Sequence, residues 1–245
     1  MKIKLHKNLD KKIWDKNEQI NPTVSNMLLS IAWAYIDYVR NEYDMPIYKS
    51  DIIDIIVVGS ITQLFYDNKS DIDMCIVLNM DKIQQKHPNI NIPRMLKLYY
   101  YDWAMIHICK IYGRKIDLNI HDEKTPECED RHIRGPNYSL LKNKWLFKHV
   151  VVTRQELKTM TKQADNIYKQ ILSDYKKVKK NGFQPNEIKQ FYDNLIASKR
   201  YSLDNDNKRI INPVYMAVRY FKHKGYVSKL RKIAIKKETD KYVLK

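Results

Sequence analysis

Cysteine and long apolar segments are scarce in this sequence, and each scarcity excludes a class of protein. Among 245 residues there are three cysteines and five glycines. Cys75, Cys109 and Cys128 are odd in number and unpatterned, which excludes a disulfide framework and indicates a reducing, cytoplasmic compartment. No segment approaches the ~20 apolar residues of a membrane span. The basic start MKIKLHKNLDKKIW is followed by no apolar stretch, so we expect neither a membrane span nor a secretory signal.

A zinc site is also disfavoured. Cys128 has His121 and His132 nearby in the sequence, but the spacing matches no zinc-binding pattern and a second pair of cysteines is missing. We therefore interpret these residues as a free thiol and surface imidazoles.

Acidic residues are scarce in the second half of the chain. The whole sequence has 45 Lys and Arg against 28 Asp and Glu, a formal net charge of +17. Residues 1–130 contain 17 basic and 19 acidic side chains, whereas residues 131–245 contain 28 and nine. An A+T-rich genome would enrich lysine in both halves alike, so the asymmetry indicates a partner for the second half. A polyanion is the natural partner, because clustered cations release its condensed counterions.

The sequence has enough apolar residues, 44%, to predict a folded chain of one or two domains. Its patterning predicts an α+β fold in which a mixed sheet is flanked by helices and followed by a basic helical C-terminal domain. We place the domains at residues 1–152 and 153–245. In the first domain we expect helices over Pro22–Arg40, Ile61–Tyr66 and Pro93–Tyr112. We expect strands over Ile52–Val58, Asp71–Leu78 and Lys115–Ile120, and one or two more within Tyr138–Val152. Between the last two of these regions we expect a loop over Asp122–Asn137. In the second we expect helices over Gln155–Lys180, Pro185–Lys199, Pro213–His223 and Tyr226–Ile235.

Three aspartates on two predicted strands suggest a metal site. Asp71 and Asp73 alternate with apolar residues, so both side chains lie on one face of their strand, about 7 Å apart. Asp117 lies between Ile116 and Leu118 on a later strand. Carboxylates on an otherwise apolar surface repel one another and are costly to desolvate, unless a divalent cation lies between them. Oxygen ligands of this kind suit Mg²⁺ or Mn²⁺.

Gly59 and Ser60 end the preceding strand and suggest a phosphate site. A glycine at a strand-to-helix turn lets a phosphate approach the backbone, and the Ser60 hydroxyl can add a hydrogen bond. Ser60 as a simple helix N-cap is the alternative. Metal and phosphate sites together predict in-line attack on the α-phosphate of a nucleoside triphosphate.

The string VVGSITQLFYDNKSDIDMCIVL resembles the signature of the DNA polymerase β-like nucleotidyltransferase superfamily. The resemblance implies that Asp71 and Asp73 bind two metal ions, that Asp117 binds the catalytic one and helps activate the attacking hydroxyl, and that Gly59 and Ser60 bind the β- and γ-phosphates. The segments YSLLKNKW (138–145) and NPVYMAVRYFKHKGYVSKL (212–230) extend the resemblance to the predicted nucleotidyltransferases of large tailed phages.

Other acidic residues offer alternatives to this assignment. Asp102, Asp122 or Glu123 can replace Asp117 if the strand lies a few residues from its predicted place. We interpret Asp51 and Asp54 as solvated or capping residues.

The basic second half of the chain predicts that the acceptor of the nucleotide is a nucleic acid. Lysines and arginines interleave with aromatic residues from Tyr168 to Lys237, a composition typical of nucleic-acid surfaces, although Tyr215, Tyr220 and Phe221 fit a helical core as well. We expect transfer of a nucleoside monophosphate from a triphosphate to the 3′ end of RNA, with RNA favoured over DNA. The alternatives are a nucleotidyltransferase that modifies a protein or small molecule, and a catalytically idle nucleic-acid-binding module.

Overall fold

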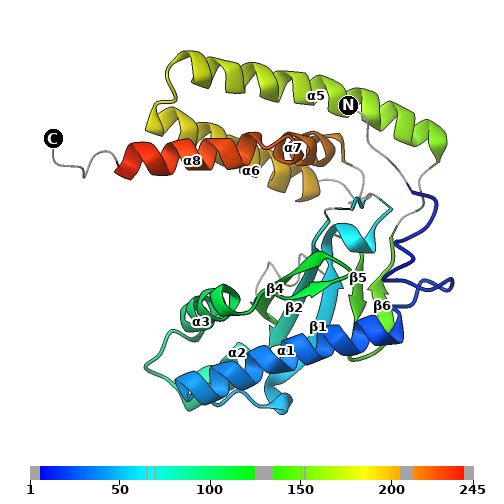
Figure 1. Cartoon of the computed structure of the whole chain (residues 1–245), viewed down its shortest axis with the longest axis vertical. Helices are drawn as coiled ribbons and strands as arrows, with labels where there is room; N and C mark the ends of the chain where they lie inside the picture. The colour runs from blue at the N-terminus through cyan, green and yellow to red at the C-terminus, as the bar shows by residue number, and fades with distance from the viewer. Residues whose placement is uncertain are drawn as a thin grey trace. The chain divides into compact units, whose positions relative to one another are not determined.

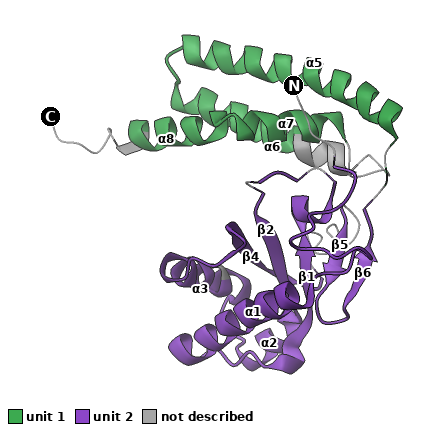
Figure 2. Ribbon diagram, turned by 45° about the vertical axis from the view of Figure 1, so that its right-hand side comes forward, with its two compact units in different colours: residues 1–3, 150–245 green, residues 4–149 purple. Residues whose placement is uncertain are grey.

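The computed structural model describes residues 6–64, 66–68, 70–124, 135–149, 151, 153–204 and 212–239. The chain divides into two compact units, coloured separately in Figure 2. We call residues 4–149 the sheet unit, and residues 150–245 with 1–3 the helical unit. The sequence predicted the domain boundary between residues 152 and 153. No helix in these described ranges combines the length and apolar character needed to cross a membrane.

The sheet unit contains one mixed sheet of six strands, in the order β3-β4-β2-β1-β5-β6. Its strands are β1 (Ile52–Val58), β2 (Ile72–Leu78), β3 (Lys110–Ile111), β4 (Arg114–Asp122), β5 (Asn137–Ser139) and β6 (Lys144–Phe147). β2 and β4 pair in parallel, and every other neighbouring pair is antiparallel. The prediction of an α+β fold with a mixed sheet and flanking helices is therefore confirmed.

One face of the sheet forms the main hydrophobic core. β2 contributes alternate residues to this face, among them Ile72, Met74 and Ile76, all fully buried. Helices α1 (Pro22–Tyr43) and α3 (Ile92–Ile106) supply the other side of the core. Figure 1 shows α1 crossing in front of the strands. Asn21 caps α1, because its side chain accepts a hydrogen bond from the Thr23 backbone N–H.

Three elements differ from the prediction. The segment after β1 forms a short 3₁₀ helix, Gly59–Thr62, instead of a helix over 61–66. An unpredicted helix, α2 (Met80–Lys86), begins where the Asn79 side chain accepts a hydrogen bond from the Lys82 N–H. Helix α3 ends at Ile106, because the chain then turns back as β3 to pair with β4. Gly113 therefore lies in a hairpin turn, at φ +78°, and does not cap the helix.

Arg114 fixes the turn that leads into β2. Its guanidinium is almost fully buried and forms an ion pair with Asp10. The same group donates hydrogen bonds to the backbone carbonyls of Asp67, at 2.6 Å, and Ser70, at 2.8 Å. Because β2 begins two residues after Ser70, this contact fixes where the chain enters β2.

Arg114→Met is expected to lower the free energy of unfolding of the sheet unit by about 3–5 kcal/mol, because it leaves the Asp10 carboxylate buried without its partner. Urea unfolding followed by tryptophan fluorescence measures this unit alone, since all four tryptophans lie within residues 4–149. Lys124→Met is the control. It removes an exposed ion pair with Asp81 and should leave the midpoint nearly unchanged. Equal shifts for the two variants would contradict this role of Arg114.

Two aromatic residues of the segment 138–145 pack with Trp14 in the sheet unit. The indole of Trp14 stacks on Trp145 with ring centres 4.7 Å apart, and Tyr138 packs edge-on against both. The Tyr138 hydroxyl lies 2.7 Å from Asn143 Oδ1, within the β5–β6 turn. These residues stabilise the β5–β6 hairpin.

The helical unit is built from α5 (Arg154–Lys180), α6 (Pro185–Asp204), α7 (Pro213–His223) and α8 (Tyr226–Thr239). Phe221 is fully buried at its centre and contacts the rings of Tyr175, Phe191 and Tyr226. Residues 205–211, between α6 and α7, lie outside the described residues.

Candidate functional site

Asp73 and Asp117 are neighbours on adjacent strands. In the parallel pairing of β2 with β4 the two residues are in register, so their side chains lie on the same face about 4.8 Å apart between strand axes. That face is opposite the main core. Asp71 precedes β2 by one residue and is exposed, whereas Asp73 and Asp117 are half-buried. Two of the three predicted carboxylates are thus brought together, and the third lies two residues away along the chain.

Gly59 lies directly against the Asp73 carboxylate. The antiparallel pairing places Val58 opposite Asp73, so the next residue, Gly59, begins its turn over that side chain. A Cβ atom on Gly59 would lie 1.9 Å from Asp73 Oδ2 and 2.8 Å from its Cγ. Gly59 also has φ +84°, a backbone conformation that favours glycine. Glycine at this position therefore leaves room for the carboxylate.

Ser60 and Thr62 lie in the 3₁₀ helix after β1. Val58, and not Ser60, is its N-cap, so the alternative of Ser60 as the cap is wrong. Ser60 is 9% exposed. The Thr62 hydroxyl lies 2.8 Å from the Gly59 carbonyl and 2.9 Å from that of Pro136, which fixes the turn to the segment before β5.

Tyr100, on α3, is a site residue that the sequence did not reveal. Its hydroxyl donates a hydrogen bond to Asp117 Oδ1 at 3.1 Å and also interacts with the Leu118 backbone. Burial raises the pKa of Tyr100 to about 12, and the charge and hydrogen bond of Asp117 add to the effect. The phenol is therefore protonated at neutral pH and orients one oxygen of Asp117, which leaves Oδ2 for another partner.

The donor set fits a hard divalent cation bound together with a substrate. Within the described ranges, no group of three or more His, Cys, Asp or Glu is arranged to hold a metal ion without help. Mg²⁺ in proteins commonly takes one or two carboxylates and completes its shell with water and substrate phosphates. The registered pair Asp73 and Asp117 meets that requirement, and the space against Gly59 accommodates one of its carboxylates.

The alternative third ligands lie elsewhere. Asp102 accepts hydrogen bonds from the hydroxyls of Tyr38 and Tyr43, on α1. Asp122 lies opposite Leu78, at the far end of β4 and roughly 17 Å along the strand from Asp117. Glu123 follows it there. Cys128 and His132 lie outside the described residues.

Asp51 and Asp54 are buried, so their interpretation as solvated residues is wrong. Asp51 pairs with Lys86 at 2.9 Å and with Lys82 at 3.1 Å, and it accepts a hydrogen bond from the Tyr48 N–H. The expected capping role is therefore present at Asp51. Burial opposes its ionisation, but these partners lower its pKa below the ordinary value. Asp54 accepts a hydrogen bond from the Ser139 hydroxyl at 2.7 Å and pairs with Lys142.

The helical unit exposes cations along α5, α7 and α8. Residues 150–245 contain 23 Lys and Arg against nine Asp and Glu, so five of the cations first counted with the second half belong to residues 131–149. The exposed ones at the end of α5 and around the α7–α8 turn are Lys176, Lys177, Lys179, Lys180, Lys222, Lys224, Lys229, Arg231, Lys232 and Lys236. The aromatic residues divide between two roles: Phe221 and Tyr175 are core, whereas the partly exposed Tyr192 and Tyr220 lie under Arg231 and Lys224.

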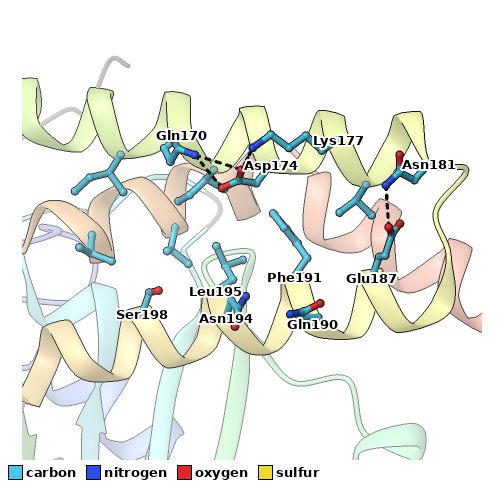
Figure 3. A pocket seen from close by; sticks show the side chains of 15 residues that line it. Gln170, Asp174, Lys177, Asn181, Glu187, Gln190, Phe191, Asn194, Leu195 and Ser198 are labelled. Carbon is cyan, nitrogen blue, oxygen red and sulfur yellow. Dashed lines mark hydrogen bonds and ion pairs between the residues drawn. The ribbon is translucent and has the colours of Figure 1, made fainter.

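A groove of about 520 Å³ runs between α5 and α6, with α7 as its floor (Figure 3). Its polar side chains largely pair with one another. Asp174 accepts hydrogen bonds from Gln170 and Lys177, and Glu187 accepts one from Asn181. The groove therefore lacks the converging carboxylates of the site on β2 and β4.

Comparison of the chain with models of protein families, with curated proteins and with solved structures finds no match. The geometry of the site is therefore the basis for assigning a function.

Proposed function

We propose that the protein is a metal-dependent nucleotidyltransferase that moves a nucleoside monophosphate from a nucleoside triphosphate to an acceptor hydroxyl at the 3′ end of RNA. One observation supports the proposal more than any other. The carboxylates of Asp73 and Asp117 are in register on adjacent strands, and Gly59 gives the first of them room.

The proposed reaction breaks a phosphoanhydride bond of the triphosphate and forms a phosphoester bond to the acceptor. The acceptor oxygen forms a bond to the α-phosphorus, and the bond from that phosphorus to the bridging oxygen breaks, so that pyrophosphate leaves. Asp117 Oδ2, the oxygen that Tyr100 does not occupy, receives the acceptor proton or orients the hydroxyl. Gly59 and Ser60 bind the β- and γ-phosphates beside Asp73.

Asp71, Asp73 and Asp117 would bind Mg²⁺ or Mn²⁺, with the triphosphate completing the coordination. When bound, the cation would neutralise charge on the phosphates and lower the pKa of the attacking hydroxyl. The cations of the helical unit would bind the RNA backbone. A cytoplasmic setting, where nucleoside triphosphates are abundant, belongs to the same proposal.

A screen of substrates tests the proposal. The purified chain is incubated with each labelled triphosphate, Mg²⁺ or Mn²⁺, and RNA, DNA or protein acceptors in turn. Label in RNA is the expected result. Label in protein alone would contradict the RNA assignment and favour a protein-modifying enzyme. Triphosphate binding without label in any acceptor would contradict the enzymatic assignment.

Tyr100→Phe is expected to reduce the rate of transfer by about 10–100-fold, because Asp117 loses the group that orients it. The Michaelis constant for the triphosphate should change little. Tyr101→Phe is the matched control, since that neighbouring phenol is exposed and has no hydrogen bond among the described residues. Equal rates for the two variants would contradict the role of Tyr100.

The same substitution has a signature in the pH dependence of stability. A phenol whose pKa is raised from about 10 in the unfolded chain to about 12 in the fold stabilises the fold at lower pH. That stabilisation is lost as pH rises from about 10 to about 12. The free energy of unfolding of the wild-type chain should therefore fall more steeply across this range than that of Tyr100→Phe, as measured by tryptophan fluorescence.

A further inference from the structure

Two lysines face each other at the edge of the sheet next to the carboxylates. Lys110 on β3 pairs directly with Lys115 on β4, across a two-residue turn. Side chains directly opposite one another lie about 4.5–5.5 Å apart at Cβ and share a face. Lys115 precedes Asp117 by two residues, so the lysines lie on the carboxylate face, roughly 7 Å along the strand.

Within the described ranges, no ion pair neutralises the charge of either lysine. Lys110 and Lys115 are both exposed, and neither ammonium group has an ion pair or hydrogen bond among the described residues. Like charges directly opposite one another destabilise an antiparallel pair. An anion between the two ammonium groups would remove that repulsion, and a phosphate group supplies the negative charge and the hydrogen-bond acceptors that two lysines can bind.

The turn that joins the two strands adds an aromatic surface. Tyr112 has φ +50° and a 56% exposed side chain, and Gly113 follows at φ +78°. Such turns favour Asn-Gly or Gly-Gly, so a tyrosine at the first position carries backbone strain without burying its ring. An exposed ring beside two lysines is the combination that single-stranded nucleic acids use for stacking and backbone contact.

The order of the strands indicates whether these lysines lie beside the triphosphate or beside the acceptor RNA. Gly59, which follows β1, lies on one side of Asp73, and the β3–β4 hairpin lies on the other side of Asp117. We propose that Lys110 and Lys115 bind a phosphodiester of the acceptor RNA next to its 3′ end, with Tyr112 available to stack on an unpaired base. This rests on the proposed function, in which the triphosphate occupies the Gly59 side.

The test compares two double variants with the same loss of charge. Lys110→Gln/Lys115→Gln removes the proposed contact. Lys16→Gln/Lys144→Gln removes two exposed lysines on the β6 side of the sheet unit, and neither of these has an ion pair among the described residues. Binding of a fluorescein-labelled single-stranded oligoribonucleotide is measured by anisotropy over a range of salt concentrations. No triphosphate is present, so the result does not depend on catalysis.

Loss of two phosphate contacts should reduce the slope of log K against log salt by about 1.4, which corresponds to roughly 25-fold weaker binding at about 0.1 M salt if affinities converge near 1 M. The control should keep the wild-type slope. Equal slopes for both double variants would overturn the proposal. A loss of Mg²⁺–triphosphate affinity with unchanged RNA binding would also overturn it, because the lysines would then bind the triphosphate. If no nucleotide transfer is detected, the dependence of RNA affinity on salt concentration still tests this proposal, because the binding measurement needs no catalysis.

Discussion

Asp73→Asn is expected to abolish nucleotide transfer while the sheet unit stays folded. Asp73 lies between Val58 and Asp117 in the sheet, so it faces both the proposed phosphate site and the proposed acceptor site. The amide keeps the shape of the side chain but removes the charge that a divalent cation needs. Loss of that ligand should cost about 4 kcal/mol of transition-state stabilisation, a rate reduction of roughly 10³-fold. Single-turnover transfer with a labelled triphosphate measures it.

Asp122→Asn is the matched control for Asp73→Asn. Asp122 is another half-buried aspartate, and it lies on β4 at the opposite end of the sheet from Asp117. Its substitution should leave transfer near the wild-type rate. A rate loss for Asp122→Asn as large as that for Asp73→Asn would place the site at the wrong end of the strands.

Gly59→Ala is expected to remove activity without unfolding the chain. The new methyl group would overlap Asp73 Oδ2, at 1.9 Å, and the carboxylate would have to rotate away. Rotation of the side chain can move Oδ2 and Cγ but not the Asp73 Cβ, which would lie 3.2 Å from the new methyl group. The stability loss should therefore combine the cost of the positive φ, about 1–3 kcal/mol, with a smaller cost from this contact. The displaced carboxylate would no longer face Asp117, and both transfer and Mg²⁺–triphosphate binding should be lost.

Gly113→Ala isolates the contribution of the backbone. Gly113 has φ +78°, close to that of Gly59, but a Cβ atom there meets nothing within 4 Å. Gly59→Ala should therefore lower the unfolding midpoint of the sheet unit somewhat more than Gly113→Ala, because only Gly59→Ala also adds a contact with Asp73. Only Gly59→Ala should lose Mg²⁺–triphosphate binding, measured by calorimetry. Unimpaired binding in Gly59→Ala would contradict the close packing of Gly59 against a functional carboxylate.

The strands of the candidate site were predictable because their sequences allow little else. Ile52–Val58 is β-branched and apolar apart from Asp54, and Ile72–Leu78 places Asp73 among apolar neighbours. The sequence predicted that Asp73 and Asp117 share a metal site, but their register was not predictable, since a parallel register depends on side chains more than forty residues apart in the sequence. The sequence indicated a phosphate-binding role for Gly59 but not its packing against Asp73, because that contact depends on the strand register.

Tyr100 and the buried aspartates show where sequence reasoning stops. Tyr100 is one of three consecutive tyrosines in an aromatic helix, so nothing local distinguishes the ring that reaches Asp117 from its neighbours. Asp51 was interpreted as solvated or capping, and its burial was missed because its partners, Lys82 and Lys86, lie more than thirty residues away. The end of α3 was predicted too late, because the pairing of β3 with β4 outweighs the local preference for helix.

The most direct test of the proposed function is to follow the two ends of the triphosphate separately. Wild-type protein and Asp73→Asn are incubated with RNA, Mg²⁺ and triphosphate labelled at either the α- or the γ-phosphate. We expect that α-label enters RNA, that γ-label leaves as pyrophosphate, and that both processes stop in Asp73→Asn. Transfer of γ-label to an acceptor, or equal α-labelling by the two proteins, would contradict nucleotidyl transfer at this site.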